Sequence, residues 1–194
     1  MKQGPGPGVE LALGLGVSPN GDCFLTGIFQ MTPTANFEGV VLTNRSGPPP
    51  PGVPYSSDAF LAKYDSNGNL KWAQVYDQRG DDVNYPVAAD SDGNCYVSGF
   101  ISKPSSFGDT TLQPLSARNI FVAKYNPSGQ VLWAKQFGGR IAGDGSQNQG
   151  TGLAIDASGN ILLTGFFGSA VALVRWNCSH QSRGQGRVCG QAYT

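Results

Sequence analysis

Charged residues are scarce in this sequence, and neither sign of charge is in excess. They make up 13% of the 194 residues, and 13 basic residues cancel 13 acidic ones. Without a basic cluster the chain has neither a groove for nucleic acid nor a polybasic patch for a membrane surface. It also lacks any apolar run near the roughly 20 residues that a membrane-spanning helix needs. We therefore expect no nucleic-acid partner and no membrane span.

Residues that carry catalysis or bind metals are equally few. The chain has one histidine and four cysteines. No nucleophile elbow is present, and before residue 174 no histidine is available as a base. The adjacent Asp81 and Asp82, like Asp144, fall in connecting loops, where carboxylates without a pocket do not make a site. The sequence therefore predicts no catalytic, cofactor-binding or metal-binding residues, and an enzyme is the less favoured class.

Glycine and proline, in contrast, are abundant, with 28 and 13 copies. They separate short runs of β-branched and aromatic residues, which is typical of an all-β fold. An aromatic content of 10% argues against disorder. The first ten residues hold one lysine with no apolar segment behind it, so no signal peptide is visible.

The chain is built from internal repeats. One motif occurs as "SPNGDCFLTGIF" (18–29), "SDGNCYVSGFI" (91–101) and "ASGNILLTGFF" (157–167). A second motif follows the first two copies, as "SDAFLAKYDSNGNLKWAQVY" (57–76) and "RNIFVAKYNPSGQVLWAKQF" (118–137). Each motif places two apolar runs around a short glycine-containing turn, which is the pattern of a β-hairpin. The clearest predicted strands are residues 87–90, 95–100, 119–125 and 130–137.

The predicted strands are apolar on both faces, as "IFVA" (120–123) illustrates. A strand has this character when both faces of its sheet are covered. Sheets stacked around an axis cover one another in this way, and that is the design of a β-propeller with four-stranded blades. The repeat region, residues 1–173, holds about two and two-thirds blades and does not close. The predicted units are about 9–77, 84–139 and 149–173.

These motifs resemble the SBBP repeat, the seven-bladed β-propeller repeat of bacterial and archaeal proteins. The stretches "DAFLAKYDSNGNLKWA" (58–73) and "DSDGNCYVSGF" (90–100) carry the resemblance. It implies a fragment of a longer repeat protein, and a non-catalytic scaffold at the cell surface or outside the cell. Its expected partners are the remaining blades and an unknown protein or glycan bound through loops. The alternative is part of a propeller lyase or hydrolase whose active-site blades are missing here.

The segment 174–194 repeats nothing in its present form. Read one base later, its degenerate codons permit "FDGTALTSRGGKDVFVAKLT". That string aligns without a gap with "FGDTTLQPLSARNIFVAKYN" from Phe107. We therefore predict a reading-frame slip between about residues 168 and 174, the alternative being a divergent terminal cap. An out-of-frame tail is no independent domain. Its residues carry no functional information, so a zinc site is not expected from Cys178, His180 and Cys189.

The turns "DSNGN" (65–69) and "DSDGN" (90–94) have two interpretations. Alternating carboxylates and amides are typical of calcium loops, but the further ligands of an EF-hand are absent. Asn-Gly and Asp-Gly also supply the positive φ of a tight hairpin turn, and this interpretation is favoured. Two other segments are assigned to loops: the proline-rich 46–57, as a solvent-facing insertion, and the glycine-rich 138–150, as an inter-blade connection.

Three pairs of recurring residues are assigned to packing between blades. Trp72 and Trp133 recur in register, which favours blade packing over ligand stacking. Lys63 and Lys124 recur inside apolar strands, so we expect each stem to lie between blades with its amine on a polar partner. Candidate partners are Asp58, Asp90 and Asp156. A further repeat position holds Cys23 and Cys95 but Ile161 in the third unit, which indicates a packing site rather than a disulfide.

Overall fold

Every regular element in the described part of the chain is a β-strand, in this computed structural model of the protein. The all-β class predicted from the sequence is confirmed. Among the described residues, no helix has the length and apolar character needed to cross a membrane. The structure describes residues 9–30, 32–44, 50–51, 57–76, 86–115, 117–137, 148–167, 170–176 and 191–193.

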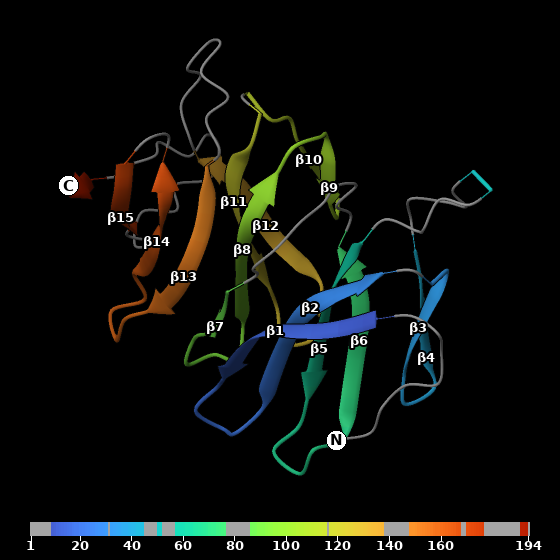
Figure 1. Ribbon diagram of the computed structural model, residues 1–194. Coiled ribbons are helices and arrows are strands. Elements are labelled where there is room, and N and C mark those ends of the chain that lie inside the picture. Colours follow the sequence, from blue (N-terminus) through green and yellow to red (C-terminus); the bar gives the residue numbers. More distant parts are fainter. Residues whose placement is uncertain are drawn as a thin grey trace.

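Two of the three four-stranded antiparallel sheets match the predicted blades closely (Figure 1). The predicted strands agree with the observed ones to within one residue at each end, because the turns between them are marked so clearly. Blade 1 consists of β1 (Val9–Val17), β2 (Cys23–Gln30), β5 (Asp58–Tyr64) and β6 (Leu70–Tyr76). Blade 2 consists of β7 (Val87–Ala89), β8 (Cys95–Ile101), β11 (Asn119–Tyr125) and β12 (Val131–Phe137).

The third sheet extends into the segment that the frame-slip hypothesis treats as out of frame. β15 runs on to Trp176, and the three-residue β16 pairs with it along Leu173–Arg175. The frame slip itself stays a prediction about the nucleotide sequence. Blade 3 consists of β13 (Gln149–Ile155), β14 (Ile161–Phe167), β15 (Ala170–Trp176) and β16 (Gln191–Tyr193).

A two-stranded hairpin is inserted between the second and third strands of each of the first two blades, and the sequence analysis did not predict these strands. In blade 1 it consists of β3 (Thr34–Phe37) and β4 (Val40–Thr43). In blade 2 it consists of β9 (Ser105–Phe107) and β10 (Thr110–Leu112). The proline-rich segment 46–57 follows β4 and lies almost entirely outside the described residues.

Five turns of one form connect the strand pairs. In the turn Asp65–Asn69, the Asp65 N–H donates to the Asn69 carbonyl and the Gly68 N–H donates to the Asp65 carbonyl, both at 2.9 Å. The fourth residue is a glycine with positive φ, which other residues adopt only with strain. The preferred interpretation of these turns as hairpin turns is thus confirmed. The five glycines are Gly21, Gly68, Gly93, Gly129 and Gly159, with φ of 85°, 80°, 77°, 85° and 78°.

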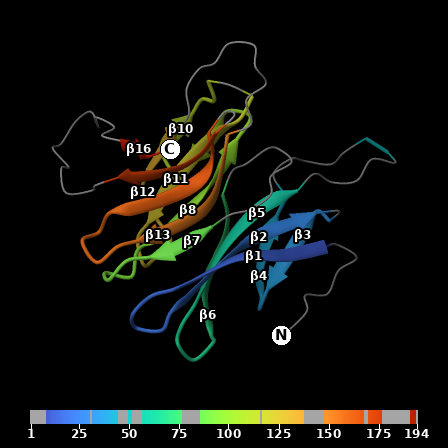
Figure 2. The ribbon, with the colours of Figure 1, turned by 60° about the vertical axis from the view of Figure 1, so that its left-hand side comes forward.

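The three blades stack face against face along the chain (Figures 1 and 2). We call the face of a blade that points to the following blade its front face, and the opposite one its rear face. One apolar cluster joins the front of blade 1 to the rear of blade 2, where Leu61 and Phe121 are both fully buried. A second joins the front of blade 2 to the rear of blade 3 through residues such as Val122 and Leu163. In the described part of the chain the sheets form an open stack of propeller blades and do not close into a ring.

The repeated glycine of the first motif has a steric cause. β1 and β13 each carry a bulge, between Ala12 and Gly14 and between Gly150 and Gly152. The backbone around the bulge lies so close to the second strand that a Cβ at Gly27 would overlap the Leu11 carbonyl oxygen. A Cβ at Gly165 would overlap the Gln149 carbonyl oxygen in the same way. The strands can approach this closely only because glycine has no side chain.

Candidate binding groove between the first two blades

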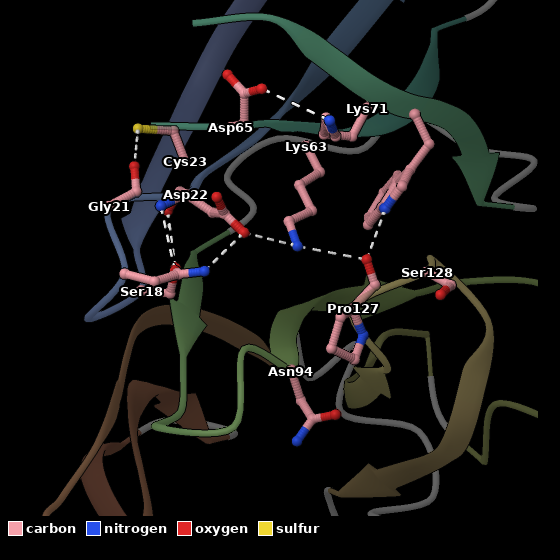
Figure 3. Close-up of polar contacts among 12 residues, drawn as sticks. Ser18, Gly21, Asp22, Cys23, Lys63, Asp65, Lys71, Asn94, Pro127 and Ser128 are labelled. Atoms are coloured by element: carbon pink, nitrogen blue, oxygen red, sulfur yellow. Dashed lines mark hydrogen bonds and ion pairs between the residues drawn. The ribbon is translucent and has the colours of Figure 1, made fainter. Parts of the chain in front are cut away.

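The outer turn of blade 2, Asn126–Gln130, receives three hydrogen bonds from blade 1. The Pro127 carbonyl accepts from Trp72 Nε1 at 3.0 Å and from Lys63 Nζ at 3.4 Å (Figure 3). The Gly129 carbonyl accepts from Gln74 Nε2 at 3.0 Å. We call this set the turn contact. A Cβ at Gly129 would lie 3.1 Å from the Trp72 ring, so the glycine also allows the indole to lie flush on the turn.

Both recurring tryptophans pack between blades, which confirms their assignment. Trp72 lies at the first blade interface, with its ring centroid 6.2 Å from that of Phe24. Trp133 lies at the second interface, where it meets Tyr96 edge-on with centroids 6.0 Å apart. Aromatic pairs favour such tilted arrangements over flat stacking.

The recurring lysines form ion pairs at the same interfaces. Lys124 Nζ lies 3.2 Å from Asp90 Oδ2, which confirms Asp90 as a partner. Lys63 Nζ lies 2.8 Å from Asp22 Oδ2, a residue that the sequence analysis did not consider. The hydrogen bond from Lys63 holds the pKa of Asp22 below its usual value. Asp58, the partner suggested near this lysine, lies at the opposite end of β5.

The position of the carboxylate within the turn explains the missed partner. In blade 2 the turn begins with Asp90 and ends with Asn94, whereas in blade 1 it begins with Ser18 and ends with Asp22. The two turns therefore present a carboxylate to the lysine from opposite ends. Asp156 opens the corresponding turn of blade 3, and its carboxylate accepts the Ser158 and Asn160 N–H groups.

The turn carboxylates considered as calcium ligands face the backbone of their own turns. Asp65 Oδ1 accepts the Asn67 and Asn69 N–H groups at 3.0 and 2.9 Å. Asp90 Oδ1 accepts the Asp92 and Asn94 N–H groups at the same two distances. These bonds lower the pKa of both carboxyls, in Asp90 against the effect of burial. No group of three or more His, Cys, Asp or Glu residues suited to a metal ion occurs within the described ranges.

The two recurring cysteines are free thiols, so the disulfide alternative is wrong for this pair. Cys95 is completely buried on the rear face of blade 2, and burial raises its pKa to about 12. Ile161 takes the same place in blade 3 and is also buried. The assignment of this position to packing is confirmed. Cys23, on the rear face of blade 1, is only half-buried.

A groove of about 640 Å³ opens beside the turn contact. Three segments that are distant in sequence form its walls: the outer strand of blade 1, the β9–β10 hairpin and the outer strand of blade 2. Its lining combines polar side chains with apolar surface, which suits a ligand held by hydrogen bonds and partial burial. The lining residues are Gln74, Val75, Ser106–Asp109, Tyr125 and Gly129–Leu132.

Tyr125 is the unusual member of the groove lining. Its side chain is almost completely buried, and its hydroxyl has no hydrogen-bond partner among the described residues. Burial raises the pKa of Tyr125, so the hydroxyl stays protonated and can donate as well as accept. A buried polar group without a partner destabilises a fold by about 1–3 kcal/mol. A ligand or water that reaches this hydroxyl therefore gains a favourable partner.

Several residues weighed in the sequence analysis lie outside the described residues. They are the tail residues Cys178, His180 and Cys189, the loop carboxylates Asp81, Asp82 and Asp144, and the glycine-rich segment from 138 to 147. The sequence does not predict the groove, because no local motif marks it. Only the stacking of two blades brings its walls together.

Comparison with known proteins supports a repeat protein of the propeller kind. The sequence is 28% identical over 167 residues to an uncharacterized WD repeat-containing protein of Acanthamoeba polyphaga mimivirus. The match covers 80% of this chain but only 11% of the length of that relative. WD repeats form β-propeller blades, so this likeness agrees with the blades of the structure. The match to this WD repeat-containing protein does not show that the chain belongs to the SBBP repeat family.

Two further comparisons do not assign the chain to a family. No family model matches the sequence. A crystal structure of a protein of unknown function from Bacteroides caccae aligns with 95% of this chain and 61% of its own, at 13% identity and a TM-score of 0.38.

Proposed function

We propose that the chain is a non-catalytic propeller scaffold that binds an extended polypeptide segment in the groove between blades 1 and 2. The observation that carries the proposal is the groove itself, with its mixed lining and the buried, unpartnered hydroxyl of Tyr125. A polypeptide offers both the polar groups and the side chains that such a lining accepts. The likeness to one WD repeat-containing protein supports the repeat-scaffold part of the proposal.

Selection of random peptides displayed on phage, about 12 residues long, tests this proposal. We expect enriched peptides whose binding is weakened about tenfold, or 1.4 kcal/mol, by Asp109→Arg in the groove lining. Asp92→Arg is the matched control, because Asp92 is exposed in the first turn of blade 2, away from the groove. If the peptides bind both variants with the same affinity as the parent protein, the groove is not the binding site.

The proposal includes a location at the cell surface or outside the cell, in an SBBP-type repeat protein of a bacterium or archaeon. Only the sequence resemblance supports this part. The complete gene tests it, because a secreted scaffold requires an export signal upstream of these blades. Recurrent His, Arg and Asp at channel-facing strand starts of further blades would instead favour the enzyme alternative.

A further inference from the structure

The groove between blades 1 and 2 has a single ionisable acid in its lining, Asp109, and no basic residue. The rest of the lining consists of glutamine, serine, tyrosine, glycine and apolar residues. Asp109 is exposed in the turn of the β9–β10 hairpin, and it forms no ion pair with a basic residue in the described part of the chain. The lining therefore carries a negative charge that none of its own side chains neutralises.

Two uncharged groups of the lining add hydrogen-bond acceptors to this carboxylate. The Tyr125 hydroxyl is buried without a partner among the described residues, and its oxygen can accept a hydrogen bond. Gln74 donates its amide N–H to the Gly129 carbonyl, so its amide oxygen is the end that stays available. A carboxylate, a hydroxyl and an amide oxygen suit a cation that only donates hydrogen bonds. The charged groups of lysine and arginine have this character.

The combination of a hairpin acid and a tyrosine at the end of a strand recurs in blade 1. The β3–β4 turn holds Glu38 and the β9–β10 turn holds Asp109, and a glycine is the other turn residue in each. Tyr64 ends β5 as Tyr125 ends β11. Burial and, after it, the charge of Glu38 raise the pKa of Tyr64, so this acid acts on the tyrosine of its own blade. Two units thus share the arrangement, although the acid occupies a different one of the two turn positions.

A ring contact fixes each hairpin on its blade just before the acid. Phe107 ends β9 and lies against Phe121 of β11, with ring centroids 4.9 Å apart. Phe37 ends β3 and lies against Phe60 of β5, with centroids 4.7 Å apart. The acid follows within two residues of the fixed ring, so its place relative to the blade is set by the packing of the hairpin.

We propose that the polypeptide bound in the groove places a lysine or arginine side chain against Asp109, with the Tyr125 hydroxyl as a further acceptor. The inference rests on the proposed peptide binding and names the side chain that the groove selects. The carboxylate gains a charge-assisted hydrogen bond, which is roughly twice as strong as one between neutral groups. The hydroxyl gains the partner that it lacks among the described residues.

The peptides enriched from the phage library give the first test, because their sequences record the preferred side chains. We expect a lysine or arginine at one fixed position in most of them. A synthetic peptide of such a sequence is then compared with a copy that carries norleucine at this position, which keeps an apolar stem and removes the charge. In isothermal titration calorimetry, the norleucine peptide should bind the full chain about tenfold more weakly than the basic peptide.

A double-mutant cycle identifies the partner of the basic side chain. Asp109→Asn keeps the shape of the carboxylate and removes its charge, so it should weaken the basic peptide about tenfold and the norleucine peptide by less than about twofold. Asp92→Asn is the matched control and should change neither affinity, because Asp92 is exposed outside the groove. Tyr125→Phe should weaken the basic peptide about threefold. It should not lower the melting temperature, because it removes a buried hydroxyl without a partner.

The outcomes separate this inference from the proposed function. If Asp109→Arg weakens enriched peptides that share no basic residue, the groove is the binding site and the charge pairing is wrong. The same holds if Asp109→Asn weakens the basic and the norleucine peptide equally. An unchanged affinity of the basic peptide for Tyr125→Phe would overturn the role of the hydroxyl. If no peptide is enriched, or if Asp109→Arg has no effect, the proposed function fails and this inference fails with it.

Discussion

The two blade interfaces share their apolar stacking but differ in polar contacts. At the first interface, an apolar cluster is joined by the turn contact and by the Lys63–Asp22 ion pair. At the second, the apolar cluster, the Tyr96–Trp133 contact and the equivalent Lys124–Asp90 ion pair are present. The corresponding turn of blade 3 falls between β15 and β16, outside the described residues, and the frame-slip hypothesis predicts that its native sequence is replaced from about residue 174. Stacking is thus a property of every unit, whereas the turn contact requires a complete following unit.

Removal of a core side chain should break either interface. Phe121→Ala at the first should lower the free energy of unfolding by about 3–5 kcal/mol, and Leu163→Ala at the second by about 2–5 kcal/mol, through lost burial and cavity formation. Urea denaturation measures both. Leu132→Ala, on the exposed side of the outer strand of blade 2, should change the value by less than about 0.5 kcal/mol. A harmless Leu163→Ala would show that the two stacks are not equivalent.

Restoring the first strand of the second motif in blade 3 should give that blade the lysine–aspartate ion pair that blades 1 and 2 have. Replacement of the residues from 174 onward by "FDGTALTSRGGKDVFVAKLT" introduces a lysine that corresponds to Lys124, in the blade whose first turn carries Asp156. One charge-assisted hydrogen bond contributes about 1.5–3 kcal/mol. For a chain of this size we expect a melting temperature about 5 °C higher. An unchanged or lower value in calorimetry would contradict the frame-slip hypothesis, as would a nucleotide sequence without a missing or extra base.

Lys63→Met should remove the ion pair with Asp22 and one of the three hydrogen bonds of the turn contact, and keep the packing of the stem. The lysine contacts both Asp22 and the Pro127 carbonyl, so we expect a loss of about 1.5–3 kcal/mol at pH 7. Because Lys63 lowers the pKa of Asp22, its contribution is present above the ordinary aspartate value of 3.8 and disappears as the pH falls through the lower folded value. Urea denaturation should therefore show the difference between the parent and the variant shrinking below pH 3.8. A difference that stays unchanged at low pH would assign the effect to packing or to the hydrogen bond with the Pro127 carbonyl, because neither depends on the charge of Asp22.

The two rear-face cysteines should differ in their reactivity toward an alkylating reagent in the folded protein. Cys23 is half-buried on the open rear face of blade 1 and should react with iodoacetamide in the folded protein. Cys95 is buried between blades with its pKa raised to about 12, so it should react only after unfolding. Peptide mapping by mass spectrometry distinguishes the sites. Equal labelling of both thiols in the folded state would mean that blade 2 is not covered by blade 1.

The sequence predicted the blade strands well because each signal was local and repeated. The turn at Pro127–Gly129 marked the ends of two strands, and apolar runs on both faces indicated stacking. The small hairpins were missed because strands of three or four residues, such as Ser105–Phe107, carry no clear period. The Asp22 ion pair was missed because the carboxylate changed its place within the turn. The groove and the unpartnered hydroxyl of Tyr125 depend on distances between blades, which no local pattern records.

The exchange of carboxylate position between the first two units has a consequence for repeat engineering. Ser18→Asp alone would give the first turn two acidic residues, and Asp22→Asn alone would leave Lys63 without a counter-ion. Transplanting the five-residue turn as a block, Asp90–Asn94 for Ser18–Asp22, keeps a single carboxylate at the two ends of the turn for the lysine, while Asp92 adds a second acid at an exposed position. Whole turns, rather than single amino acids, are therefore the interchangeable modules from which chimeric arrays of this repeat can be assembled.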